Sequence, residues 1–339
     1  MKQNHSIAIL SAAMLALAGC GGGGSGTPPN LSEKINAIPG LMDNPKPVYA
    51  EDADDTVESL AGTEFGTLSS AISRTFGDEP GVSLPDSLNA YIASLTPTAE
   101  DGIDAVFMVD GEKMPLSFAN QEDEKTIEGT EYELGKFEGL STENPLARDY
   151  FELAWWGYHP EDGLDYSGHL AYGARTSPAS LPTTTASYSG YMFGNFLADD
   201  GETPRWASHR HSLWGQLRLT ADFDRSTISG MVDSLAIRRP ADEVNEGDDP
   251  WTDLPETTSI AISESEIVQG RYIATWTGQD TDADNPMGTS ARGFSGQMAG
   301  DFYGPNAEET AGVFSGNRDN LHIYGVFGAT TAHEHLPNN

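Results

Sequence analysis

One pair of histidines has a spacing that could bind a metal. His209 and His211 lie two residues apart, so on an extended chain both imidazoles would point to the same side and could hold a metal ion or haem iron. We favour an exposed pair without a ligand as the interpretation. His159 and His169 stand further apart in the chain, and each is assigned a structural or exposed role. The prediction is therefore that no cofactor is bound, with haem as the alternative.

Three aspartates resemble the start of a calcium site. Asp280, Asp282 and Asp284 have the opening spacing of an EF-hand loop. The turn position of that loop holds Asn285 instead of glycine, and its twelfth position holds Ala291 instead of glutamate. A solvated acidic turn is therefore the favoured interpretation. The three carboxylates remain weak candidates for calcium ligands.

Cys20 is the single cysteine, and its position predicts a covalent modification. A short polar start with Lys2 precedes an apolar run over residues 7–18, which is too short to span a bilayer and suits a signal-peptide core. Small residues precede the cysteine, as a lipoprotein signal peptidase requires. We predict that residues 1–19 are removed and that Cys20 becomes an acylated, palmitate-bearing anchor. The alternative is a free buried cysteine.

The chain is strongly acidic, with 52 acidic and 18 basic residues and a formal net charge of −34. A nucleic-acid binder needs a basic footprint to displace counterions, so nucleic acid is excluded as a partner. The same charge argues against docking onto an anionic membrane, which leaves the lipid as the predicted membrane contact. No glycine-rich phosphate loop, His-Glu-x-x-His segment or Gly-x-Ser-x-Gly elbow occurs in the sequence. We therefore predict a protein that is not an enzyme.

The elements that would position these residues divide the sequence after the signal peptide into four parts. Residues 20–44 are rich in Gly, Ser and Pro and predict a flexible tether. Residues 45–182 predict a mixed, β-rich domain. Residues 183–330 predict a succession of strands, and residues 331–339 form a tail.

The first folded part combines helical and strand patterns. The spacing of Leu68, Ile72 and Phe76 predicts a short helix over 65–76, and a second short helix is predicted over 86–95. Residues 105–118 predict a β-hairpin with a two-residue turn, and residues 150–158 predict an aromatic strand. The acidic stretch 121–133 predicts a solvated edge or loop.

The second folded part contains eight strand-like runs separated by turn chemistry. Phe294, Met298 and Phe302 share one face with Gly296 and Gly300. Large side chains separated by glycine suit the crowded interior of a small barrel, and eight strands close around an interior that side chains fill. We predict an eight-stranded antiparallel β-barrel, and the filled interior argues against a carrier with a ligand inside. The eight runs are Thr185–Gly194, Gly215–Asp224, Thr227–Ile237, Ser259–Ile267, Arg271–Gly278, Arg292–Gly304, Thr310–Ser315 and Leu321–Thr330.

A motif near the end of the chain resembles a known family. Gly293–Gln297, Phe302–Glu309 and Ala311–Phe314 resemble a signature in the barrels of transferrin-binding protein B. The run Ile323–Ala329 is similar to the last strand of those barrels. The resemblance covers residues 183–330 and implies that the preceding part is the handle domain found before such barrels.

The motif has a physical meaning that concerns the fold. Gly304 and Pro305 turn the chain. Glu308 and Glu309 are predicted to keep that turn hydrated, and Gly312 to relieve crowding where the next strand packs. The motif therefore specifies a fold and names no ligand.

The resemblance implies a surface lipoprotein of the outer membrane. Such a protein would act as a binding module that holds an iron carrier, haem or another protein partner for uptake, with export and uptake machinery as further partners. This chain has one handle and one barrel where transferrin-binding protein B has two lobes, and the transferrin-contacting loops are not recognisable. The alternative is an adhesive or envelope-structural lipoprotein that binds other proteins without a nutrient role.

Overall fold

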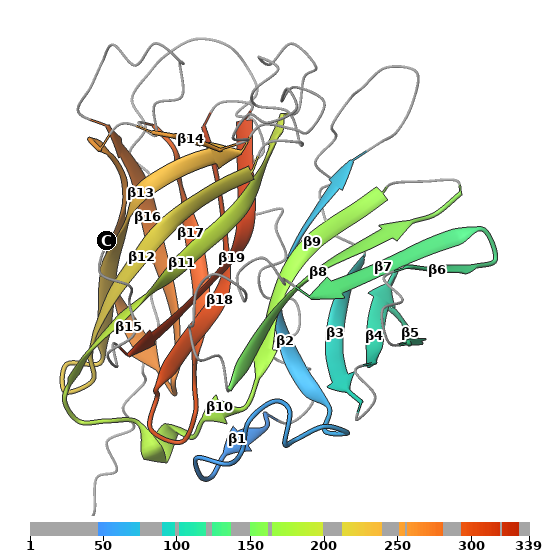
Figure 1. The fold of residues 1–339 in the computed structure, drawn as a ribbon, viewed down its shortest axis with the longest axis horizontal. Coiled ribbons are helices and arrows are strands. Elements are labelled where there is room, and N and C mark those ends of the chain that lie inside the picture. The colour runs from blue at the N-terminus through green and yellow to red at the C-terminus, as the bar shows by residue number, and fades with distance from the viewer. Residues whose placement is uncertain are drawn as a thin grey trace, which may run out of the picture.

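The computed structural model describes most of the chain after the predicted tether. Within the described residues the strands form two sheets, a handle sheet and a barrel, which lie side by side in Figure 1. No helix in the described part of the chain is long and apolar enough to cross a membrane. The described residues are 47–74, 90–98, 102–119, 124–136, 150–161, 165–198, 212–238, 251–254, 256–280, 293–318 and 321–331.

The handle is an eight-stranded antiparallel sheet with the order β5-β4-β3-β2-β9-β8-β7-β6. Its central strands β2, β9 and β8 contact barrel strands β18 and β19. Consecutive residues of β9, Leu170, Ala171 and Tyr172, are buried, so both faces of this central strand are covered over part of its length. The strands are β2 (Phe65–Arg74), β3 (Ala90–Pro97), β4 (Ile103–Val109), β5 (Glu112–Phe118), β6 (Glu124–Ile127), β7 (Thr130–Lys136), β8 (Phe151–His159) and β9 (Asp165–Gly173).

The barrel closes with eight antiparallel strands, as the sequence predicted. The strands from β11 to β17 pair in chain order, with β14 outside this path, and β17 pairs with β18. Strand β18 pairs with β19, and β19 pairs with β11, which closes the barrel. Each of the eight predicted runs overlaps one strand. The strands are β11 (Thr185–Ala198), β12 (Ser212–Asp222), β13 (Thr227–Arg238), β15 (Thr258–Val268), β16 (Arg271–Asp280), β17 (Ser295–Tyr303), β18 (Glu309–Arg318) and β19 (Leu321–Thr331).

Four short elements complete the fold. Strand β14 (Trp251–Asp253) pairs with β13. Strands β1 (Tyr49–Ala50) and β10 (Arg175–Thr176) pair in parallel, and β10 pairs with β17. A 3-10 turn over Pro178–Ser180 follows β10. The segment between the two sheets is thus hydrogen-bonded to the barrel.

The β-rich character of the handle is confirmed, but the two helices predicted within it are wrong. The segments 65–76 and 86–95 lie in strands β2 and β3 wherever the structure describes them. A register shift follows Ile92 in the pairing of β3 with β4, so Ile92 and Leu95 are both buried although they are three residues apart. In β2, both faces are buried over part of the strand. The register shift in β3 and the burial of both faces of β2 each place buried residues three positions apart, as in a helix.

The predicted hairpin and aromatic strand of the handle are confirmed. Asp110 and Gly111 have φ values of 51° and 83°, which fits the two-residue turn between β4 and β5. The predicted aromatic strand is β8. The acidic stretch contributes the edge strand β6, and Glu128 and Gly129 make a second turn of the same kind.

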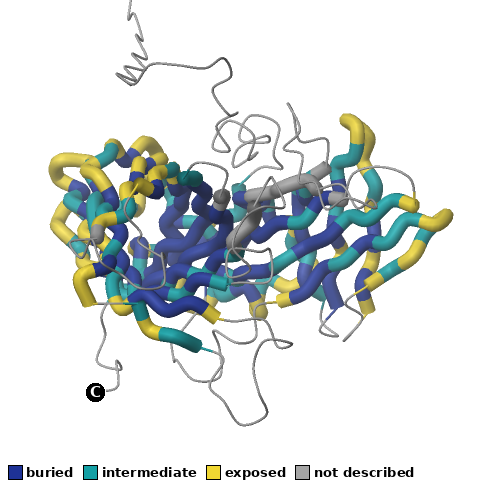
Figure 2. The backbone as a smooth tube through the Cα atoms, turned by 90° about the horizontal axis from the view of Figure 1, so that it is seen from above, coloured by how far each residue is buried: buried dark blue, intermediate teal, exposed yellow. Residues whose placement is uncertain are grey.

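The barrel interior is filled with aromatic side chains. The Phe302 ring centroid lies 5.7 Å from that of Tyr188, 5.0 Å from that of Phe223 and 5.6 Å from that of Tyr272. A methyl group on Gly300 would meet the Tyr272 ring, so glycine makes room for that ring. Figure 2 shows that buried residues run through both sheets; exposed residues lie at turns and also alternate with buried ones along barrel strands such as β16. The prediction of a filled interior is confirmed.

Candidate binding site

Most side chains predicted to bind a ligand lie outside the described residues. Asp280 is the last residue of β16 and stands opposite Thr258 of β15. Among the described residues, no group of three His, Cys, Asp or Glu side chains could hold a metal ion. The predicted site residues that lie outside the described ranges are Cys20, His209, His211, Asp282 and Asp284.

The strand order nevertheless groups the connections that carry these residues. Every neighbouring pair of strands from β11 to β17 is antiparallel, and β16 is four strands along from β11, so the two strands run in the same direction. Strands β11 and β16 therefore end at the same end of the barrel, where β12 and β17 begin (Figure 1). His209 and His211 belong to the first connection, and Asp282 and Asp284 to the second. Both connections therefore leave from and return to one end of the barrel.

His169 lies between the handle and the barrel. Its ring centroid is 5.1 Å from that of Tyr324 and 6.2 Å from that of Phe193, and its Nε2 lies 3.4 Å from Asn195 Nδ2. Burial lowers the pKa of His169 to about 3, so the imidazole is neutral at physiological pH. The side chain occupies the junction as an uncharged packing group.

His159 has a different environment at the end of β8. Its Nε2 lies 3.2 Å from Glu133 Oε2, and both side chains are partly exposed. Cross-strand pairing of β7 with β8 brings the two side chains together. The two histidines of the handle thus serve separate local contacts.

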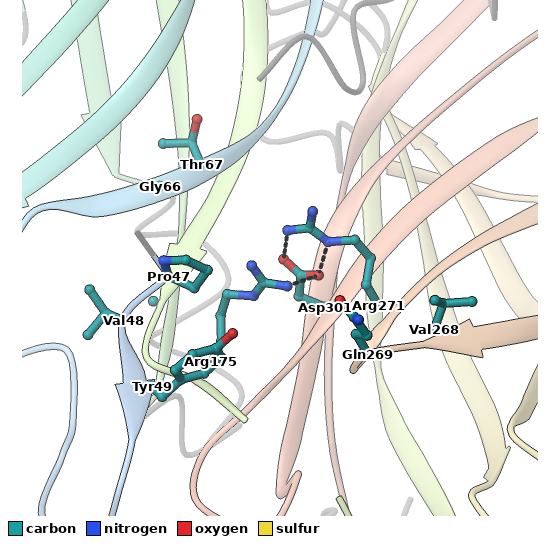
Figure 3. Close-up of a pocket in the computed structure, with 11 residues that line it drawn as sticks. Pro47, Val48, Tyr49, Gly66, Thr67, Arg175, Val268, Gln269, Arg271 and Asp301 are labelled. Atoms are coloured by element: carbon teal, nitrogen blue, oxygen red, sulfur yellow. Dashed lines mark hydrogen bonds and ion pairs between the residues drawn. The ribbon is translucent and has the colours of Figure 1, made fainter. Parts of the chain in front are cut away.

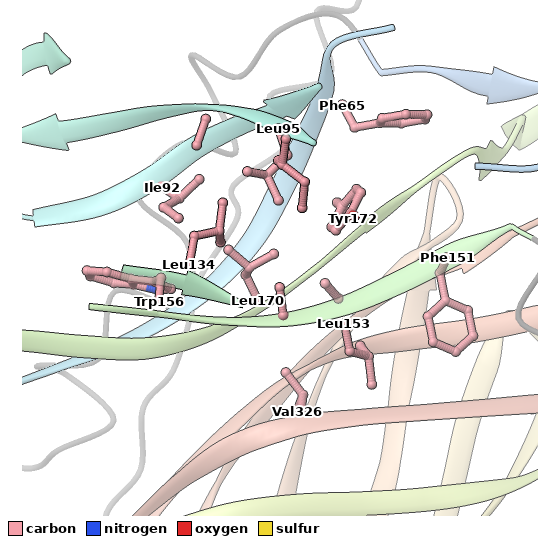
Figure 4. Packing of buried hydrophobic residues seen from close by; sticks show 14 of the residues in the cluster. Phe65, Ile92, Leu95, Leu134, Phe151, Leu153, Trp156, Leu170, Tyr172 and Val326 are labelled. Atoms are coloured by element: carbon pink, nitrogen blue, oxygen red, sulfur yellow. The ribbon is translucent and has the colours of Figure 1, made fainter. Parts of the chain in front are cut away.

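The handle and barrel share one hydrophobic cluster. The Phe151 ring on β8 lies over Gly328 of β19, where an added methyl group would come within 2.6 Å of Phe151 Cζ. The Phe151 and Tyr303 ring centroids are 5.7 Å apart. Figure 4 shows Phe151 and Leu153 directed toward the barrel, with Val326 opposite them. Packing across this junction holds the two parts in one orientation.

The turn of the resemblance motif belongs to the same junction. Glu309 is 2 % exposed, and its Oε2 accepts a hydrogen bond of 3.1 Å from the backbone N–H of Tyr150 in the handle. The prediction that Glu309 keeps the turn hydrated is therefore wrong, because the handle covers it. Glu308 closes the turn by accepting two bonds of 2.8 Å from Asn306. The Gly304 N–H donates to the carbonyl of Ala174 at 3.0 Å.

The predicted role of Gly312 agrees with its surroundings. A methyl group there would overlap the Ala299 carbonyl oxygen on β17, which is backbone and cannot move aside. Glycine is therefore required for the close approach of these two strands.

A cluster of charges that sequence reasoning missed is formed by residues of β10, β16 and β17. Arg271 donates from Nε and Nη2 to the Asp301 carboxylate at 2.7 and 3.0 Å, and Arg175 Nη2 donates to Asp301 Oδ1 at 2.9 Å. Burial lowers the pKa of Arg271, but the hydrogen bond and charge of Asp301 outweigh this and raise it above its usual value. Arg271 stands opposite Asp301 in the ladder of β16 with β17. Only that register and the path of β10 bring the three side chains together.

The comparisons with known proteins agree with the barrel. Residues 181–331 match the family model described as the C-lobe and N-lobe beta barrels of Tf-binding protein B. The barrel is similar to the barrels of transferrin-binding protein B. No curated protein matches the chain. The barrel resemblance that the sequence motif carried is therefore confirmed.

Solved structures of the same kind are also similar to the chain. Transferrin-binding protein B from Haemophilus parasuis shares 14% identity at a TM-score of 0.40, with 81% of this chain and 60% of that chain covered. The isotype 1 protein from Neisseria meningitidis shares 15% identity at a TM-score of 0.36, with 78% and 57% covered. The N-lobe of lactoferrin-binding protein B from Moraxella bovis shares 15% identity at a TM-score of 0.30, with 58% and 79% covered. The chain thus spans about 60% of the first two structures.

Proposed function

We propose that this protein is a lipid-anchored lipoprotein of the outer-membrane surface that acts as a binding module. It would capture an iron carrier, haem or another protein partner and deliver it for uptake. The observation that carries the proposal is the match of residues 181–331 to the barrels of a transferrin-binding protein. Cys20 would supply the lipid anchor, and no catalytic step is part of the proposal.

The packing of the barrel supports a ligand that binds on the outside. Phe302 and its aromatic neighbours fill the interior, so the barrel holds its shape without a cargo. A rigid barrel is a suitable support for binding loops, because loops tolerate sequence change while the scaffold holds them in place. The partner would therefore contact connections at the barrel end and neighbouring parts of the handle.

The junction between handle and barrel supports a composite binding surface. Phe151 packs on the barrel, and the bond from Tyr150 to Glu309 fixes the handle's entry into the junction. A surface formed from two parts that pack against each other is ordered before the partner arrives to the extent that this packing holds, which lowers the entropy lost on binding.

Protease shaving of intact cells tests the surface location. We expect external protease to remove the handle and barrel while a periplasmic control protein survives. A Cys20→Ala variant is the matched control, since it lacks the acylated residue and should not be retained at the membrane. Protection of the domain on intact cells would contradict the proposal and favour a periplasmic or envelope-structural role.

Capture by the same cells tests the nutrient role. Cells that display the full chain should retain an iron-loaded carrier protein or haem, whereas cells without it should not. For haem, a Soret band that is lost in the double variant His209→Ala, His211→Ala would locate the iron ligands. The double variant His333→Ala, His335→Ala removes a pair with equal spacing and serves as the control. Capture of proteins that does not depend on iron or haem would favour the adhesive alternative.

A further inference from the structure

A cavity of about 210 Å³ lies where the handle side of the chain meets the β15–β16 turn of the barrel. Pro47 and Tyr49 line it from the start of the described chain, and Val268 lines it from the turn. Arg175, Arg271 and Asp301 provide its charged wall. Figure 3 shows the two guanidinium groups on either side of the Asp301 carboxylate, with Pro47 across the opening from Arg271.

The two arginines have more hydrogen-bond donors than the described residues satisfy. A guanidinium carries five N–H bonds in a planar fork and has no acceptor. Within the described residues, Arg271 uses two of its donor atoms on Asp301, and Arg175 uses one. The remaining N–H bonds of both groups therefore suit a ligand that only accepts hydrogen bonds.

The charges at the cavity do not balance. Two guanidinium groups face one carboxylate, so the charged lining residues sum to a formal charge of +1, although the chain as a whole has −34. The Asp301 side chain is 3 % exposed, and the side chains of Arg175 and Arg271 are 16 % and 21 % exposed. Partly buried charge without a counterion is unfavourable, because little water reaches it to screen it. One singly charged anion would neutralise the site.

We propose that this cavity binds a small oxyanion, a phosphate or carboxylate group, at the N–H bonds of Arg175 and Arg271 that point away from Asp301. Guanidinium forks match the geometry of both groups by donating parallel N–H bonds to two oxygens. Asp301 holds the two arginines in position and limits the site to one net positive charge. Tyr49, which is 37 % exposed, also lines the cavity. This site is separate from the partner-binding surface proposed above and does not depend on it.

Two sources of the anion follow from the location of the cavity. Pro47 lies at the start of the described chain, downstream of the predicted lipid anchor, and lines the cavity. The phosphate of a membrane lipid and a free anion such as phosphate would therefore both have access. The chemistry that binds them is the same, and the experiment separates them.

Titration of the acylated full-length protein in non-ionic detergent tests the site. Binding of inorganic phosphate and of acetate is measured by calorimetry at an ionic strength held constant with sodium chloride. We expect saturable binding of phosphate, at least tenfold weaker in Arg175→Gln. Arg218→Gln is the matched control, because Arg218 pairs with Asp233 at 2.7 Å on the barrel surface and is 56 % exposed. Absence of phosphate binding, or equal affinity in Arg175→Gln, would overturn the proposal.

Asp301→Asn separates an anion site from a purely structural ion cluster. The substitution leaves two guanidinium groups without a carboxylate, so the variant should melt at a lower temperature than the parent. We expect phosphate to bind this variant more tightly and to raise its melting temperature more than that of the parent. If phosphate leaves the melting temperature of Asp301→Asn unchanged, the three residues form a structural cluster only.

A water-soluble short-chain phosphatidic acid distinguishes the two sources. If it displaces phosphate at a concentration at least tenfold lower than phosphate requires, the site is specific for a lipid headgroup. If the two bind with equal affinity, the site takes the free anion. Either result supports an oxyanion site, provided that Arg175→Gln weakens it.

Discussion

His169 shows how burial controls the charge of one side chain at the handle–barrel junction. Its ring packs beside Tyr324 and Phe193, and desolvation lowers its pKa from 6.5 to about 3. Between pH 6.5 and about pH 3, His169 of the unfolded chain binds a proton and His169 of the native protein does not. The folded state is therefore destabilised as the pH falls below 6.5, and this effect is complete near pH 3.

A non-titrating substitution should reveal this contribution. The free energy of unfolding of the parent should fall more steeply between pH 6.5 and pH 4 than that of His169→Gln. The difference should approach about 1.4 kcal/mol per pH unit. Denaturant unfolding measures both proteins, and values taken relative to pH 8 cancel any loss of packing. Parallel pH profiles would contradict the assignment of His169 as a neutral buried group.

Glu309 operates at the scale of elements, because it connects the first residue of β18 to the chain that enters β8. The carboxylate accepts the Tyr150 N–H at a position that the handle covers. Hydrogen bonds to a charged acceptor contribute about 1.5–3 kcal/mol in proteins. The turn after β17 therefore does more than reverse the chain, since it also holds the handle against the barrel.

Glu309→Gln should loosen this junction without opening the barrel. We expect faster amide hydrogen exchange at residues 150–153 and 303–310, and unchanged exchange in the β12–β13 pair. Glu308→Gln is the neighbouring control, because Glu308 accepts its side-chain bonds from Asn306 within the turn. Equal exchange at the junction in the two variants would show that packing of Phe151 alone holds the handle.

At the scale of the whole molecule, the net charge of −34 dominates the electrostatics. Carboxylates repel one another across the surface, and this repulsion opposes the compact state. Salt shortens the range of the repulsion, since the Debye length falls from about 30 Å at 0.01 M to about 3 Å at 1 M.

The melting temperature should therefore rise between 0.01 M and 1 M sodium chloride. Potassium chloride should act equally, because screening does not depend on the identity of the cation. Calcium chloride at matched ionic strength tests the run that begins at Asp280, where an additional rise would indicate a specific calcium site. A melting temperature that falls with salt would show that attractive ion pairs outweigh the repulsion.

The sequence by itself determined the barrel. Alternation in β12, where Leu217, Leu219 and Ala221 are buried, depends only on neighbouring residues of one strand. The turn between β4 and β5 is equally local, because Asp110 and Gly111 set its geometry. A family motif then indicated the order in which such strands close.

Tertiary structure alone decided the features that depend on pairing between distant segments. Segments far along the chain bury both faces of β2 and pair with β3 across the bulge after Ile92. The buried residues of these two strands therefore do not follow the simple alternation that identifies a strand in the sequence. Glu309 was predicted to be hydrated, but the handle covers it in the folded protein. Arg175 and Asp301 are 126 residues apart, and no local pattern relates them. Their contact follows from long-range register, which hydrophobic periodicity does not encode.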